Sequence, residues 1–335
     1  MDARPTPEQR ELDDAAVRLA EKLGPTAVGD LDDTDRRARL DAALAQAGWR
    51  ELRTGTPAEP LASGVEAALV ARSLARGACD VAFVGPVLAH DLLRRCGSDT
   101  ADDGTTRTIA VAPDLTRLAR GSGLAVDAAG SSAALALDAS GTTLVEFALA
   151  ESDGADGIDL TRRSSALASD PVSSFGSVAA DELVAWEALA VTLTAADLVG
   201  VMEGAIDLSA AYARERRQYG VPIGSFQAVQ HLLAEAKTLS EGALSAMLYA
   251  AWAVDALEPD EARAAAAVAK AYAARSARTV CETAIQVHGG IGNTWECMAH
   301  VFLRRALLST ELFGGESSQL ALLAQQRWGA RHGLS

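Results

Sequence analysis

Aromatic side chains are scarce in this sequence. They make up 4% of its 335 residues, although 49% of the residues are apolar and alanine is very abundant. Alanine and leucine favour helices, and a core of small side chains lets helices pack closely against one another. The composition therefore predicts a mainly helical protein, and the length is enough for two or three domains with large cores.

Basic residues are also in short supply. The chain has 30 Lys and Arg against 45 Asp and Glu, so that the net charge is −15. Nucleic acids and anionic membrane surfaces attract basic faces, and this balance argues against either partner. Charges interrupt the apolar stretches before they reach membrane-spanning length, and the charged N-terminal residues contain no apolar segment of the signal-peptide kind. We therefore expect no membrane insertion and a cytoplasmic location.

Cysteine is rare, with four residues: Cys79, Cys96, Cys281 and Cys297. None of them has CxxC spacing, and no Cys/His cluster has the spacing of zinc ligands, so that the sequence predicts no metal site. We expect reduced and mostly buried thiols, as in a cytosolic protein.

The hydrophobic pattern changes twice along the chain. Apolar residues recur at helical spacing over 7–24, 33–47, 63–76 and 86–95. Short β-like runs follow at 108–112, 124–127, 134–137 and 143–148, and 151–179 is irregular and polar, with room for further strands. Long helical patterns return at 183–217, 226–257, 260–288, 296–308 and 317–328. These switches in period predict an N-terminal helical domain (1–105), a small β domain (106–178) and a C-terminal helical bundle (179–335).

Four local sequences stand out in the C-terminal half. The first is RERRQYG at 214–220, followed by PIG at 222–224. The second is FQAVQH at 226–231, the third is QVHGGIG at 286–292 with TWE at 294–296, and the fourth is LRRA at 303–306. In this order and at these separations they resemble the helical bundle of the acyl-CoA dehydrogenase family. The resemblance is clear over about residues 181–330, extends to the first hundred residues, and is poor in the β domain.

The resemblance implies an α+β fold that is mainly α and acyl-CoA dehydrogenase-like, with an N-terminal helical domain, a small reduced β domain and a C-terminal four-helix bundle. It also implies FAD, which in the family lies across a subunit boundary against the bundle of the neighbouring chain. By motif position Arg216 binds the diphosphate, for which a planar guanidinium fork is suited. Gln227 and Gln286 would donate to cofactor oxygens, and Gly289 and Gly290 would let the backbone approach closely. The expected cofactor-binding set is completed by Gln218, Tyr219 and Val287.

The sequence departs from the family where the catalytic glutamate belongs. The family reaction removes two hydrogens from an acyl-CoA: a carboxylate takes the α-proton, and the flavin takes a hydride. The two positions that can hold this glutamate carry Ala190 and Gly314 here. Glu187, Glu311 and Glu316 lie nearby, but each is more simply explained as a solvated helix residue or a cap. The resemblance therefore implies no catalytic residue in this chain.

The β domain lacks the family's T-E-P-x-A-G-S-D-like and W-I-T-N-like stretches, the first of which holds a chain's own flavin ring. A chain that supports a neighbour's FAD without holding its own resembles the short subunit of actinobacterial α2β2 acyl-CoA dehydrogenases that act on steroid side chains. The implied partners are a longer acyl-CoA dehydrogenase chain, an acyl-CoA substrate such as a steroid side-chain thioester, and an electron-transfer flavoprotein.

Two alternatives stay open at this point. In the first, the chain forms a homotetrameric acyl-CoA dehydrogenase that uses Glu316 or Glu311 as its base. In the second, from a different functional class, it is a scaffold or regulatory bundle that binds no flavin.

Overall fold

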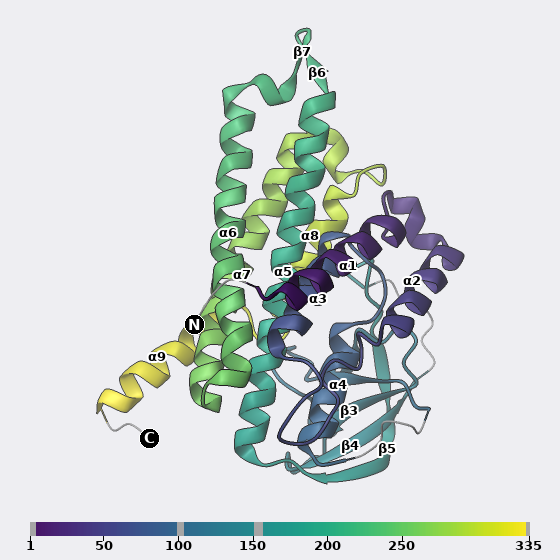
Figure 1. The fold of residues 1–335 in the computed structure, drawn as a ribbon, viewed down its shortest axis with the longest axis vertical. Coiled ribbons are helices and arrows are strands. Elements are labelled where there is room, and N and C mark those ends of the chain that lie inside the picture. The colour runs from purple at the N-terminus through teal and green to yellow at the C-terminus, as the bar shows by residue number, and fades with distance from the viewer. Residues whose placement is uncertain (1–4, 99–103, 151–156, 333–335) are drawn as a thin grey trace.

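The computed structural model describes residues 5–98, 104–150 and 157–332, with side chains up to residue 327. Figure 1 shows a tall bundle of helices, with a group of N-terminal helices against one side and a small sheet at its lower end. One large core cluster contains buried residues from the N-terminal helices, the sheet and the bundle, and a second cluster fills the inside of the sheet. The three parts therefore share a core.

Four helices precede the sheet. They are α1 (Pro7–Leu23), α2 (Thr34–Ala47), α3 (Gly64–Arg76) and α4 (Val84–Arg95), with a 3-10 turn η1 (Val28–Asp32) after α1. Thr6 caps α1 and Ser63 caps α3, because each hydroxyl accepts a hydrogen bond from a backbone N–H of the first turn. Helix α3 is buried along most of its length, since it packs between α1 and the long helix α5 (Ala180–Glu215).

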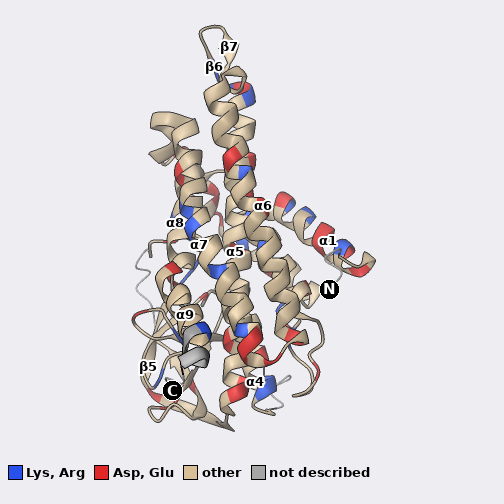
Figure 2. Ribbon diagram, turned by 90° about the vertical axis from the view of Figure 1, so that its left-hand side faces the viewer, with Lys and Arg blue, Asp and Glu red and all other residues tan. Residues whose placement is uncertain are grey.

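The bundle is built around α5. Its other members are α6 (Gln227–Ala256), α7 (Pro259–His288) and α8 (Ala299–Glu311), and α9 (Glu316–His332) packs against α7. By length and composition α5 could cross a membrane, but 94% of its most apolar window is buried inside the protein. The central position of α5 in the core explains its apolar sequence. On the side shown in Figure 2, acidic and basic residues are interspersed along the helices.

Two glycines allow α5 to cross α3 closely. A Cβ at Gly200 would lie 2.0 Å from the carbonyl oxygen of Arg72, and a Cβ at Gly204 would lie 2.3 Å from that of Arg76. Neither distance is possible between real atoms, so the backbones meet here without room for a methyl group. The two glycines in the otherwise uninterrupted helical pattern are therefore explained by packing against α3.

The sheet is a closed barrel of five strands in the order β1-β2-β5-β4-β3. The strands are β1 (Arg107–Val111), β2 (Leu124–Val126), β3 (Ala133–Leu137), β4 (Thr143–Leu149) and β5 (Ser165–Ser177). Neighbouring strands are antiparallel except β1 and β3, which are parallel. Most buried residues inside the barrel are alanines, because a barrel of few strands has little interior space.

Strand β5 lies in the segment 151–179, for which the sequence predicted irregular, polar chain with room for further strands. In the described part of that segment, β5 runs for 13 residues and pairs with both β2 and β4. Most of its side chains are exposed, and Pro171 lies in its middle. It therefore lacks the alternation by which strands are recognised, and its pairing with β4 shifts register at three places.

The predicted fold class is confirmed: the chain is mainly helical, with an N-terminal helical part, a small β domain and a C-terminal bundle. The four cysteines are free thiols, and Cys79, Cys281 and Cys297 are buried. Burial raises the pKa of Cys79 and of Cys281 to about 12, so both are protonated at neutral pH. The expectation of mostly buried thiols agrees with this placement.

Replacing Gly200 by alanine should destabilise the protein, although alanine is the better helix former. The added methyl group has no space against the Arg72 carbonyl, and overpacking of this kind costs about 1–3 kcal/mol of unfolding free energy. Denaturant unfolding measures the change. The control is Gly29→Ala, where a Cβ would meet nothing within 4 Å. Equal stability of the two variants would contradict the close crossing.

Candidate functional site

The connection from α5 to α6 forms the far end of the bundle, at the top of Figure 1. It is a tight hairpin of β6 (Arg217–Gln218) and β7 (Val221–Pro222), turned by Tyr219 and Gly220. Both turn residues have positive φ, as this type of two-residue turn requires. A 3-10 turn, η2 (Ile223–Ser225), then leads into α6.

Arg216 is fixed by its main chain, just before this hairpin. Its N–H donates to the carbonyl of Tyr212 at 2.8 Å, and its own carbonyl accepts from the N–H of Ile223 at 2.8 Å. The side chain of Arg216 is exposed and has no hydrogen bond or ion pair with the described residues. A rigid backbone therefore carries an unpaired guanidinium.

Helix α7 ends at the same end of the bundle. Gly289, with φ of 65°, closes the helix and begins the 3-10 turn η3 (Gly289–Asn293). Gly292 folds back so tightly that a Cβ there would lie 2.8 Å from the carbonyl oxygen of Ile285. Gly290 is different, because a Cβ there would meet nothing within 4 Å. Packing within this chain therefore explains glycine at position 292 but not at position 290.

A small apolar cluster joins the two turns. Ala213 from α5, Ile223 from η2 and Val287 from α7 are buried together, with Tyr212, Val229 and Leu233 partly buried around them. The ring of Tyr212 also stacks on that of His288, with centroids 4.4 Å apart. We call this end of the bundle, residues 212–231 and 285–293, the bundle tip.

The structure brings the predicted cofactor-binding residues together at the bundle tip. Exposed there are Arg216, Gln218, Tyr219, Gln227, Gln286, Gly289 and Gly290. The amides of Gln227 and Gln286 make no hydrogen bond with the described residues. Val287 is placed differently: only 7% of it is exposed, so its side chain stabilises the tip and only its main chain is left for a ligand.

The second region of interest is the loop between α8 and α9, where the family's glutamate would lie. Lys270 donates to the carbonyls of Ser309 and Leu312, the latter at 2.8 Å. The Gln319 amide donates to the carbonyls of Phe313 and Gly314 at 2.6 and 3.0 Å. The Phe313 N–H donates to the carbonyl of Leu115 in the β domain at 2.7 Å. The loop is thus bound to helices α7 and α9 on one side and to the β domain on the other.

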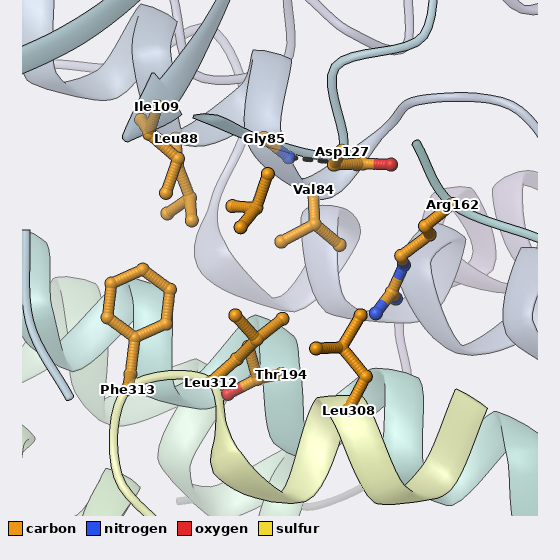
Figure 3. A pocket seen from close by; sticks show the side chains of 11 residues that line it. Val84, Gly85, Leu88, Ile109, Asp127, Arg162, Thr194, Leu308, Leu312 and Phe313 are labelled. Carbon is orange, nitrogen blue, oxygen red and sulfur yellow. Dashed lines mark hydrogen bonds between the residues drawn. The ribbon is translucent and has the colours of Figure 1, made fainter. Parts of the chain in front are cut away.

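A cavity lies beside this loop, between α4, α5, α8 and strands β1 and β2. Figure 3 shows Leu308, Leu312 and Phe313 facing Val84 and Leu88 across it. Its free space is about 20 Å³, room for about one water molecule, whereas ligand pockets measure about 300–1,000 Å³. Apolar side chains fill most of the region.

The only carboxylate that lines this cavity, among the described residues, is Asp127. It accepts hydrogen bonds from the N–H groups of Phe83 and Gly85, at 2.8 and 3.0 Å. Asp127 therefore joins the end of β2 to the start of α4. Its visible role is structural.

Packing also explains the residues at the two positions where the family carries its catalytic glutamate, Ala190 and Gly314. Ala190 is completely buried in α5. Gly314 has φ of 88°, a conformation that disfavours any side chain, and a Cβ there would lie 3.0 Å from the Cβ of Ser318. The fold of this loop is therefore poorly suited to a glutamate at position 314.

The three neighbouring glutamates lie outside the cavity lining. Burial raises the pKa of Glu187, although Arg263, 3.9 Å away, and Arg120 oppose the shift. Glu316 is 4.0 Å from Arg275, a largely exposed side chain. Glu311 is exposed. Of the three, Glu187 has the most unusual environment.

A buried charged cluster was not anticipated from the sequence. Asp197 of α5 accepts hydrogen bonds from Arg162, from Arg305 at 2.7 Å and from Ser309 at 2.7 Å. Burial alone would raise the pKa of Asp197, but the two guanidinium groups outweigh it and hold the pKa below its usual value. The only sequence signal was a charged residue within the apolar stretch of α5.

Within the described residues, no group of three or more His, Cys, Asp or Glu side chains could hold a metal ion. The chemistry that this structure offers lies in the unpaired donors of the bundle tip.

Comparisons with known proteins agree with the resemblance. Residues 181–327 match the acyl-CoA dehydrogenase C-terminal domain family. Acyl-CoA dehydrogenase FadE34 of Mycobacterium tuberculosis is 45% identical over 120 residues, which cover 36% of this chain and 17% of FadE34. The matches cover only 17%, 34% and 58% of the first three curated relatives.

Solved structures of similar shape cover nearly the whole chain. A variant of the steroid ACAD Tcur3481–Tcur3483 has a TM-score of 0.81 at 22% identity, covering 97% of this chain and 99% of that one. The ChsE4–ChsE5 complex of Mycobacterium tuberculosis has a TM-score of 0.80 at 24% identity, covering 98% and 99%. At this level of identity the comparison shows that the chain has the acyl-CoA dehydrogenase fold.

The stability of the protein should depend on the protonation of Lys270. Burial lowers the pKa of Lys270 to about 7, although Asp197 and Glu311 oppose the shift. Between pH 7 and about 10 the unfolded chain therefore binds a proton that the folded chain does not, and the Lys270 contribution to stability rises with pH. The unfolding free energy of the wild type, minus that of Lys270→Met, should rise by about 1.4 kcal/mol per pH unit in this window.

Denaturant titrations at pH 7, 8 and 9 measure this difference. Lys237→Met is the matched control, because Lys237 is exposed and paired with Glu241, and it should show no such trend. A constant difference between wild type and Lys270→Met across the series would mean that Lys270 keeps its proton in the folded protein.

Proposed function

We propose that this chain, a member of the acyl-CoA dehydrogenase family by its residues 181–327 and by its fold, is a subunit of a flavin-dependent acyl-CoA dehydrogenase. In this proposal it completes an FAD site formed with a second, longer chain, and it does not supply the catalytic base. The reaction is the α,β-desaturation of an acyl-CoA thioester.

The observation that carries the proposal is the set of unpaired donors at the bundle tip. The side chains of Arg216, Gln227 and Gln286 are exposed and form no hydrogen bond within the described residues. Gly290 is exposed, and a Cβ there would meet no atom of the described residues within 4 Å. An exposed glycine without a packing role suits a position that a ligand approaches closely.

These donors fit the chemistry of a dinucleotide. The guanidinium fork of Arg216 can bind two phosphate oxygens, the amides of Gln227 and Gln286 can donate to further oxygens, and the backbone at Gly289 and Gly290 leaves room for contact. When bound, FAD supplies the acceptor for the hydride. The role of this chain is to bind and orient the cofactor from one side.

The proposal that this chain supplies no catalytic base rests on the lack of space beside the α8–α9 loop. Phe313 and its leucine neighbours fill the region beside the α8–α9 loop, and the remaining space is too small for an acyl thioester. Asp127 is engaged by two backbone N–H groups. Proton abstraction needs a carboxylate within hydrogen-bonding distance of the substrate, and in this proposal the partner chain provides it.

Two solved structures that share the fold of this chain support the proposal of a heteromeric assembly. One is named as the ChsE4–ChsE5 complex, and another as the steroid ACAD Tcur3481–Tcur3483. By analogy we propose an α2β2 assembly, a steroid side-chain acyl-CoA as substrate, an electron-transfer flavoprotein as acceptor, and a cytoplasmic location.

Purification tests this proposal against its alternatives. The chain alone should be colourless and inactive, and it should become yellow when co-expressed with a longer acyl-CoA dehydrogenase chain from the same genome. A yellow, active protein without any partner would support the homotetramer. A colourless protein in every combination would support the flavin-free scaffold.

Removing the Arg216 side chain should weaken flavin binding in the yellow complex. A charge-assisted hydrogen bond contributes about 1.5–3 kcal/mol, so Arg216→Ala should raise the FAD dissociation constant at least about tenfold. Arg216→Lys should restore only part of the affinity, because lysine lacks the fork.

Gly290→Ala should also lower flavin content. It should leave the unfolding curve of the isolated chain unchanged, because the methyl group would meet no atom of the described residues within 4 Å.

Bound flavin per complex is measured by absorbance after gel filtration. The matched control is Arg278→Ala, which removes an exposed arginine of α7 that is paired with Glu282. If the Arg216 and Gly290 variants kept as much flavin as this control, the bundle tip would not be part of the cofactor site.

Neutralising the three candidate glutamates should leave turnover within a few fold of the wild-type complex. Glu187→Gln, Glu311→Gln and Glu316→Gln are made separately, and turnover and flavin content are measured together. If a variant kept its flavin but lost several orders of magnitude in turnover, its glutamate would be the base, and the homotetrameric alternative would gain support.

A further inference from the structure

His288 connects the two halves of the bundle tip. It is the last residue of α7 and immediately precedes Gly289, so its position sets where the glycine turn begins. His288 is 6% exposed, and its ring stacks on that of Tyr212 of α5, with 26° between the ring planes. Tyr212 in turn accepts the backbone N–H of Arg216 through its carbonyl.

The orientation of the His288 ring is fixed by its own helix. Nδ1 lies 2.7 Å from the carbonyl oxygen of Ala284, and since a carbonyl can only accept, Nδ1 carries the proton. The ring is therefore held by a hydrogen bond at one side and by an aromatic face at the other. These two contacts fix the rotamer of His288 and place a proton on its Nδ1.

A continuous path thus runs from Arg216 to Gly289. It passes from the Arg216 N–H to the Tyr212 carbonyl, through the stacked rings, and along the chain to the glycine turn. We propose that His288 is a positioning residue that holds the Arg216 turn and the Gly289–Gly290 turn at the spacing required by one ligand with two phosphates. This inference rests on the proposed FAD site.

The stack adds a directional contact to the tip, where the other side chains packed between α5, η2 and α7 are apolar. The cluster of Ala213, Ile223 and Val287 is small and non-directional. A stacked pair with one ring locked by a hydrogen bond has a defined distance and tilt. A chelating pair of donors loses affinity when its spacing changes, even if each donor is still present.

The test is a double-mutant cycle on FAD binding in the reconstituted complex. His288→Ala should raise the FAD dissociation constant about three- to tenfold, the range expected for loss of an aromatic pair. His288→Phe, which keeps a flat ring against Tyr212, should restore most of the affinity. Combined with Arg216→Ala, the His288→Ala effect should largely disappear, because the stack acts by positioning that arginine.

The control for general loosening of the tip is Leu233→Ala, which removes a neighbouring side chain of the same cluster. It should lower thermal stability about as much as His288→Ala, yet its effect on FAD binding should add to that of Arg216→Ala. Fully additive effects for His288→Ala and Arg216→Ala, or unchanged FAD binding in His288→Ala, would overturn the positioning role. A wild-type complex that binds no FAD with any partner would instead overturn the proposed function itself.

Discussion

The buried carboxylate of Asp197 is the constraint on which the arrangement of the three parts depends. It lies in the middle of α5 and accepts hydrogen bonds from Arg162, which lies just before strand β5 of the barrel, and from Arg305 of α8. Arg305 also donates to the carbonyl of Cys79 in the N-terminal part and to the hydroxyl of Thr161. Removing one partner of such a buried pair costs about 3–5 kcal/mol, because the remaining charge is left uncompensated. The bundle, barrel and N-terminal helices are therefore joined at one point.

A second buried cluster repeats this design at the lower end of the molecule. Asp91 of α4 lies between Arg53, Arg94 and Arg95, and these guanidinium groups outweigh burial and lower its pKa. Arg53 also forms a salt bridge with Asp255 at the end of α6. Arg95 forms one with Glu182 at the start of α5. Charged side chains thus fix the register between N-terminal helices and bundle, where small alanine side chains alone would permit sliding.

The α8–α9 loop and the bundle tip differ in how their polar groups are paired. The α8–α9 loop is tied to α7 by Lys270 and to the β domain through Leu115, and apolar side chains fill the space next to it. At the other end, the backbone is equally well fixed, but Arg216, Gln227 and Gln286 remain free of partners among the described residues. The filled region beside the loop and the unpaired side chains at the tip are the two observations on which the proposed function rests.

Local patterns in the sequence determined the helices and four of the five barrel strands, whereas the donors at the bundle tip were predicted from the family resemblance. Helical spacing and capping residues act over a few positions, so they can be read without knowing the fold. Strand β5 was expected only as a possible further strand without bounds, because its exposed, proline-containing sequence has no alternation of its own and it forms by pairing with β2 and β4. The packing role of Val287, the stack of His288 on Tyr212 and the buried pairing of Asp197 were decided only by the tertiary structure, since each depends on side chains that are distant in the sequence.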